Sequence, residues 1–196
     1  MRNNQTLEQV SNVAESKVQL LKNSKGKYFL SAFMAGMFIG LGILLTFTVG
    51  GVSSGLPTNK ILMGVSFGIA LSLVVVFGTE LFTGNNMVGV TGMLNKAITF
   101  KDMIFMWIAA YIGNVVGSVV LAIIYVFSNS ASKPIVDFIV KVSKAKVVAL
   151  PQELFFKGIL CNILVCLAVL AGIKLKEETA RLNGFLVSFC IYHCWI

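Results

Sequence analysis

Long apolar runs separated by short polar segments are the feature that most constrains how this chain can fold. Four runs are long enough to cross about 30 Å of hydrocarbon, and a fifth begins near Leu182 and covers only the 15 residues to Ile196. The four long runs are residues 29–50, 61–82, 103–127 and 154–173. Because lipid offers the backbone no hydrogen bonds, runs of this length fold as helices. The sequence therefore predicts an all-α integral membrane protein.

Composition excludes several other classes of protein. The chain is 57% hydrophobic and 12% charged, whereas soluble domains have about 45–50% apolar and about 25% charged residues. A nucleic-acid module is excluded despite the net charge of +8, because the 16 Lys and Arg lie mainly between apolar runs. The four cysteines form no CxxC pair and all lie in apolar runs, which favours buried thiols over a disulfide framework. We expect no cofactor.

An enzyme is also disfavoured. The only histidine is His193, so a histidine-based catalytic triad or a histidine-rich metal site is excluded. His193 has no obvious partner, and we interpret it as a structural residue.

Residues 1–27 are polar and lack the apolar core of a signal peptide. Within them, apolar residues recur every three to four positions and would form one stripe on a helix: Leu7, Val10, Val13 or Ala14, Val18 and Leu21. The spacing predicts an amphipathic helix lying on the cytoplasmic membrane face. A solvated tail is the alternative.

The distribution of basic residues predicts the orientation in the membrane. With a cytoplasmic N-terminus, ten Lys and Arg fall in the inside segments and five in the outside segments, as the positive-inside rule requires. Four of those five outside lysines lie in one connection, residues 128–150, which we expect to be an outer loop. This loop would attract anions.

The second apolar run is followed by residues that break helices. After Phe77 the sequence reads GTELFTGNNMVGVTGM, with Gly84, Asn85, Asn86, Gly89, Thr91 and Gly92 forming a breaker cluster. Non-helical backbone at membrane depth is tolerated where it lines a cavity, and broken helices recur at ion-binding sites. The pattern predicts a broken second helix, with free backbone groups between residues 84 and 92. An ordinary surface loop is the alternative.

Three motifs resemble one known family. GTELFTGNN at residues 78–86, KGILCNILVCLAV at 157–169 and AGMFIGLG at 35–42 are similar to signatures of the formate/nitrite transporters, which are pentameric anion channels of bacterial inner membranes. The first motif is closer to the nitrite and hydrosulfide branch. The resemblance covers about residues 5–182. It implies an aquaporin-like bundle whose channel domain is residues 28–196, a homopentamer in lipid, and one pore per subunit for formate, nitrite or hydrosulfide.

The resemblance also implies which residues would line the pore. Phe67, Leu71, Leu81 and Val165 would form dry constrictions, and Thr83, Asn162 and Lys146 would contact the anion. A bare charge crossing an apolar constriction costs several kcal/mol, so a weak-acid anion would cross more readily after taking a proton. Glu80 would repel an anion, so we expect it to lie off the path. Ordinary helix packing, a helix cap and solvent exposure are the alternatives for these residues.

The C-terminal part departs from the family. The resemblance implies six helices and a Gly–Phe–Glu–His motif in the fifth, but Ile191 and Tyr192 precede His193. We therefore expect a C-terminally truncated chain of five spans that lacks the sixth helix, with residues 183–196 read from a shifted frame. Sequencing the gene tests this: a TAA or TAG stop codon, or no histidine codon following in the shifted frame, would refute it. A non-conducting membrane protein or assembly fragment remains the alternative function.

Overall fold

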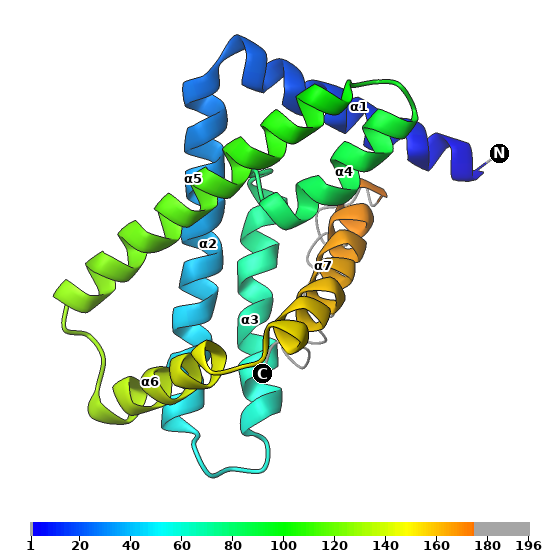
Figure 1. Cartoon of the computed structure of the whole chain (residues 1–196). Helices are drawn as coiled ribbons and strands as arrows, with labels where there is room; N and C mark the ends of the chain where they lie inside the picture. Colours follow the sequence, from blue (N-terminus) through cyan, green and yellow to red (C-terminus); the bar gives the residue numbers. More distant parts are fainter. Residues whose placement is uncertain (1, 175–196) are drawn as a thin grey trace.

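The computed structural model describes residues 2–174, and this range is built from helices joined by short connections (Figure 1). Four of the helices are long and apolar enough to cross a membrane, namely α2, α3, α5 and α7. The helices are α1 (Arg2–Asn23), α2 (Lys25–Val52), α3 (Asn59–Val76), α4 (Phe82–Leu94), α5 (Phe100–Phe127), α6 (Lys133–Val147) and α7 (Pro151–Lys174). The predicted all-α class is confirmed. The fifth predicted span, Cys190, His193, Cys194 and the tail 183–196 lie outside the described residues.

Small residues allow α2 and α5 to cross closely. A Cβ atom on Gly36 of α2 would collide with the carbonyl oxygen of Asn114, and one on Gly117 of α5 would collide with the carbonyl oxygen of Phe33. Gly113 and Gly117 are four residues apart on α5, which is the small-xxx-small spacing of closely packed membrane helices. Because the hydrophobic effect contributes little to helix association in lipid, this close packing supplies much of the energy of the α2–α5 contact.

The helix α1 lies across one end of the bundle, beside α4 (Figure 1). Its apolar stripe is covered by protein: Val10, Ala14 and Val18 are buried in a cluster that includes Val88 of α4 and Met106 of α5. The stripe therefore packs on the bundle itself rather than serving chiefly as a lipid-binding face. The placement of this end in the cytoplasm stays a prediction.

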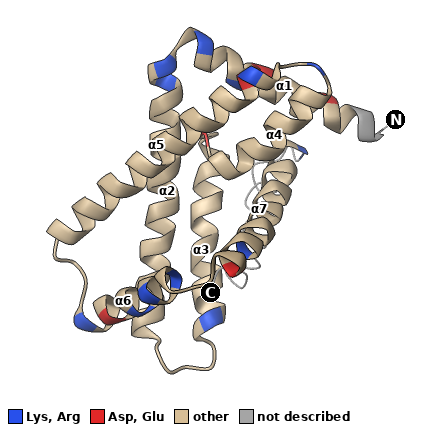
Figure 2. Cartoon of the chain, in the orientation of Figure 1, with Lys and Arg blue, Asp and Glu red and all other residues tan. Residues whose placement is uncertain are grey.

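Residues 128–150, predicted to be a loop between two spans, are largely helical. Most of this segment forms α6, which begins after Ser132 with Pro134 in its first turn, a position that suits proline. Ile135 is buried against α2, and the Phe138 ring contacts that of Phe47 with centroids 6.1 Å apart. The helix lies at the end opposite α1, and Lys and Arg gather at these two ends of the bundle (Figure 2).

The second span breaks earlier than predicted. The helix α3 ends at Val76 and α4 begins at Phe82, so the non-helical residues are 77–81, whereas residues 84–92 lie inside α4. The glycines of the predicted breaker cluster serve packing instead. A Cβ atom on Gly84 would stand 3.0 Å from Val169 Cγ2, and one on Gly92 would collide with Ala14. The prediction that the second span is broken is thus confirmed. The prediction that the break lies at residues 84–92 is wrong, because it lies at residues 77–81.

Candidate functional site

The break between α3 and α4 is held by side chains from two neighbouring helices. Gly78 adopts a φ of +59°, a left-handed conformation that suits glycine. The Glu80 backbone N–H donates to Ser31 Oγ at 3.2 Å, and the Phe82 N–H donates to Asn114 Oδ1 at 2.9 Å. The Asn114 side-chain amide donates in turn to the carbonyls of Ala32 and Glu80, at 2.8 and 2.9 Å. Asn114 therefore links α2, α5 and the break.

Sequence analysis missed both supporting residues. An amide in the middle of the apolar run 103–127 is the signal that identifies Asn114, because a buried polar group in lipid requires a partner. Ser31 carries no comparable signal, since serine is common in membrane helices.

Glu80 is buried, and its carboxylate is bonded to two side chains. Only 3% of its surface is exposed, and its Oε2 accepts from Lys17 Nζ at 2.7 Å and from Asn85 Nδ2 at 2.9 Å. Asn85 also donates to the Tyr28 hydroxyl at 3.1 Å. These bonds tie the break to α1, α2 and α4. The Glu80 carboxylate is thus bonded to α4 of the broken span and to α1.

The four residues predicted to constrict a pore come together in one apolar cluster. Leu71 and Val165 are 1% and 4% exposed, Leu81 is 8% exposed, and Phe67 packs against them while half-buried. They come from α3, from the break and from α7, so segments about 100 residues apart in the sequence meet here. Ala35, Phe38, Val74 and Ala168 complete the buried set. The four predicted residues therefore contact one another in the fold, although they lie on three separate segments.

Thr83 and Asn162, predicted as anion contacts, lie beside each other. The Asn162 side-chain amide donates to the Thr83 carbonyl at 3.0 Å, and the Cys166 thiol lies 3.7 Å from the same oxygen. One N–H of the Asn162 amide is used in this bond. Among the described residues the Thr83 hydroxyl makes no hydrogen bond. The pair joins the first turn of α4 to the middle of α7, close to Val165.

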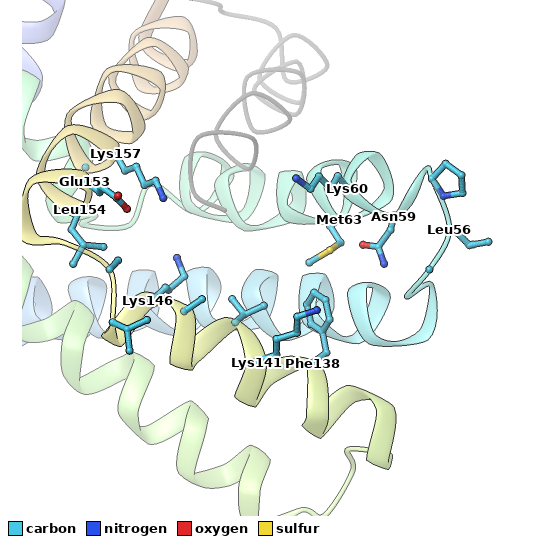
Figure 3. Close-up of a pocket in the computed structure, with 17 residues that line it drawn as sticks. Leu56, Asn59, Lys60, Met63, Phe138, Lys141, Lys146, Glu153, Leu154 and Lys157 are labelled. Carbon is cyan, nitrogen blue, oxygen red and sulfur yellow. The ribbon is translucent and has the colours of Figure 1, made fainter.

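Lys146, the third predicted anion contact, lies apart from that pair in a large cavity at the α6 end of the bundle, which we call the outer cavity after its predicted orientation. The cavity has a volume of about 880 Å³ and lies between the α2–α3 connection, α6 and the start of α7 (Figure 3). Lys60, Lys141 and Lys157 line it with Lys146, and Glu153 is the acidic residue among the described lining residues. Burial, and to a lesser degree the charge of Lys157, lowers the pKa of Lys146 below its usual range.

These features define a multi-pass helical membrane protein with a broken span beside a buried apolar cluster, and with a lysine-lined cavity at one end. The sequence model of one family, described as formate/nitrite transporter, matches residues 4–194. The chain belongs to the formate/nitrite transporter family.

Curated relatives are transporters and channels. The chain is 40% identical over 164 residues to the nitrite transporter NirC of Salmonella typhimurium, an alignment that covers 83% of this chain and 60% of the relative. It is 33% identical over 177 residues to the formate channel FocA of Haemophilus influenzae, covering 85% of this chain and 62% of that protein. The chain thus spans about three fifths of the length of these relatives. It is more similar to the nitrite transporter, and the expectation that it is not an enzyme agrees with both relatives.

Solved structures show the same fold. An ion channel of this family superposes with a TM-score of 0.87 at 34% identity, covering 98% of this chain and 76% of that one. A pentameric formate channel with formate bound gives a TM-score of 0.77 at 27% identity, covering 88% and 69%. The predicted aquaporin-like helical fold is confirmed by this likeness.

Proposed function

We propose that this chain forms the pore of a homopentameric membrane channel for small monovalent anions, with nitrite as its first candidate substrate. The higher identity to a nitrite transporter than to a formate channel supports nitrite. Formate and hydrosulfide are the other candidates, because both are small monovalent anions of weak acids. The bound formate and the pentamer in the second structural neighbour support the substrate class and the assembly.

The meeting of Phe67, Leu71, Leu81 and Val165 in one apolar cluster is the observation that carries the proposal. The cluster lies next to the Thr83–Asn162 pair, and Lys146 lies further out on the side of α6. An apolar constriction between polar regions lets a small neutral molecule pass and opposes a bare charge, which costs several kcal/mol in an apolar medium. Selectivity for anions of weak acids follows, because these can cross in the protonated form.

Each region contributes a different step. The lysines of the outer cavity raise the local concentration of anions, since clefts of one charge attract the opposite charge. The remaining N–H of Asn162 and the Thr83 hydroxyl offer hydrogen bonds beside the constriction. Glu80, neutralised by Lys17 and bonded to Asn85, keeps its charge away from the anion and fixes the break.

The proposed setting is the bacterial inner membrane, with α1 in the cytoplasm and α6 outside. Among the described residues, eight Lys and Arg lie on the α1 side and six on the α6 side, an excess that supports this orientation. Lipid would surround the exposed apolar faces of α5 and α7.

Nitrite flux into proteoliposomes that contain the chain tests the proposal. We expect nitrite uptake above that of protein-free vesicles, competition by formate, and little uptake of a divalent anion such as sulfate. The nitrite transporter NirC of Salmonella typhimurium serves as the positive control. If the chain is folded in the vesicles and nitrite uptake equals that of empty vesicles, the non-conducting alternative is the correct one.

A further inference from the structure

The outer cavity is far larger and more basic than a monovalent anion needs. Its volume is about 880 Å³, whereas a water molecule occupies about 30 Å³ of liquid and nitrite has only three heavy atoms. Among the described lining residues, four lysines stand against one glutamate, an excess of three positive charges. Size and charge together suit a ligand with several negative charges.

Three of the four lysines have no partner of their own. Within residues 2–174, Lys60, Lys141 and Lys157 make neither an ion pair nor a hydrogen bond, even though Glu153 lies in the same cavity. Flexible lysines at protein surfaces usually spread into solvent, but here they come from α3, α6 and α7 to line one hollow. Their ammonium groups are available to a ligand.

Two of these lysines lie deeper than the others and face each other. Lys146 and Lys157 are half-buried, Lys60 and Lys141 are exposed, and in Figure 3 the first two side chains point toward one another from α6 and α7. The charge of Lys157 contributes to the lowered pKa of Lys146, which indicates that the two ammonium groups repel each other. An anion with charges on separate oxygens would relieve this repulsion at both.

We propose that the outer cavity is a binding site for compact multivalent oxyanions of the phosphate type, and that such an anion blocks the pathway to smaller ones. The proposed block rests on the proposed function of the chain, whereas the proposed binding site does not. A multivalent anion cannot become neutral by taking one proton, so the apolar cluster of Phe67, Leu71, Leu81 and Val165 excludes it. It therefore stays in the cavity and competes with monovalent anions there.

Calorimetric titration of the detergent-purified chain with inorganic pyrophosphate, without magnesium and at constant ionic strength, tests the binding. We expect saturable binding that Lys157→Gln weakens about tenfold or more, as for loss of a hydrogen bond to a charged group. Lys157→Arg should retain the affinity to within about threefold, because it keeps the charge. Lys144→Gln is the matched control, because it also removes one positive charge but at a position on α6 that does not line the cavity. Screening should limit its effect on the pyrophosphate affinity to below about twofold.

A substitution at Glu153 distinguishes ligand binding by the cavity from a purely structural role of its charged residues. Glu153→Gln removes the acidic group from the cavity, so pyrophosphate should bind about two- to fivefold more tightly. Thermal melting of each variant shows whether it is folded. Absence of saturable pyrophosphate binding by the folded wild-type chain, or equal weakening by Lys157→Gln and Lys144→Gln, would overturn the proposal.

Nitrite flux in proteoliposomes then tests the block. Pyrophosphate on the α6 side should inhibit nitrite uptake at the concentrations that saturate binding, and Lys157→Gln should shift the inhibition curve by the same factor as the binding curve. Nitrite flux that is insensitive to bound pyrophosphate refutes the block and leaves the proposed function intact. Pyrophosphate binding without any nitrite flux refutes the proposed function and leaves the binding site intact.

Discussion

Lysines approach the proposed pathway at both ends of the bundle, but their surroundings differ. At the end covered by α1, the Lys17 side chain is 16% exposed and its ammonium group lies 2.7 Å from Glu80, which also accepts from Asn85. At the α6 end, Lys60, Lys141 and Lys157 line a cavity, and none of the three forms an ion pair with another described residue. A buried charge in a membrane protein must be compensated, whereas a charge in a wide cavity remains hydrated.

The difference indicates separate roles for the two sets. The Lys17–Glu80–Asn85 cluster joins α1 to the break and to α4, so its charges maintain the structure. Among the described residues, Lys60, Lys141 and Lys157 of the cavity form no ion pair, so their charges are available for the proposed anion binding. Basic residues near a pore are therefore not equivalent, and their pairing predicts whether a substitution affects stability or anion binding.

The largest expected effect is on the stability of the α1 end. Glu80→Gln leaves the Lys17 ammonium group buried without its carboxylate, which should lower the free energy of unfolding by about 3 kcal/mol or more. Thermal unfolding in detergent measures it. The control is Lys22→Gln, which breaks the ion pair with Asp102. Because the Lys22 side chain is 55% exposed, this loss should be below about 0.5 kcal/mol.

A double variant sharpens this comparison. Lys17→Gln combined with Glu80→Gln removes both charges and should recover part of the lost stability, since no unpaired charge remains. Equal losses for Glu80→Gln and Lys22→Gln would mean that the Lys17–Glu80 pair has no greater structural role than a surface pair.

The next effect concerns the apolar cluster that separates the two ends. Leu81→Ala removes a side chain that is 8% exposed and lies at the end of the break, which should widen the constriction. We expect the flux of poorly transported anions, such as acetate or sulfate, to rise several-fold relative to nitrite. Proteoliposome assays with the three anions measure this ratio. A folded variant with unchanged selectivity would place Leu81 outside the constriction.

Sequence reasoning predicted the membrane helices well because their signal is a simple one of length and hydropathy. It also selected the four residues of the apolar cluster, but only through the family resemblance; as isolated leucines, a valine and a phenylalanine they are indistinguishable from helix packing. That Glu80 lies off the path was predicted from charge repulsion alone, and it stays a prediction. Its partner Lys17 lies 63 positions away, a distance that no local pattern bridges.

Two misjudged segments have physical reasons. Gly84, Gly89 and Gly92 were interpreted as helix breakers, yet all three lie inside α4. They are glycines because neighbouring side chains lie close to where a Cβ atom would be. Glycine is common in membrane helices for this reason. Residues 128–150 were interpreted as a loop because they connect two apolar runs, but the spacing of Ile135, Phe138 and Val142 within them is helical. Lys157 was passed over because it lies inside an apolar run.

A smaller effect is expected from charge reversal in the outer cavity. Lys146→Glu should slow nitrite uptake severalfold at low salt, because the substitution replaces attraction by repulsion in the vestibule. Initial rates at several salt concentrations measure it. The difference from wild type should shrink as salt rises, since screening acts over about 8–10 Å at ordinary ionic strength. A rate that responds neither to the substitution nor to salt would remove Lys146 from the mechanism.

The smallest effect is a change in the titration of Lys146 itself. Burial and the neighbouring charge of Lys157 lower the pKa of Lys146, so its amine loses a proton at lower pH than an ordinary lysine. Competitive labelling of lysines with an anhydride across a pH series, read by mass spectrometry, measures this because only the neutral amine reacts. The labelling midpoint of Lys146 should lie below that of a lysine in an unstructured reference peptide labelled in the same reaction. Lys157→Gln removes the repelling charge, so the Lys146 midpoint should move to higher pH while remaining below that of the reference peptide, because burial persists. An unchanged midpoint would show that the two ammonium groups do not interact, and would separate Lys157 from the vestibule that the α6 end forms around Lys146.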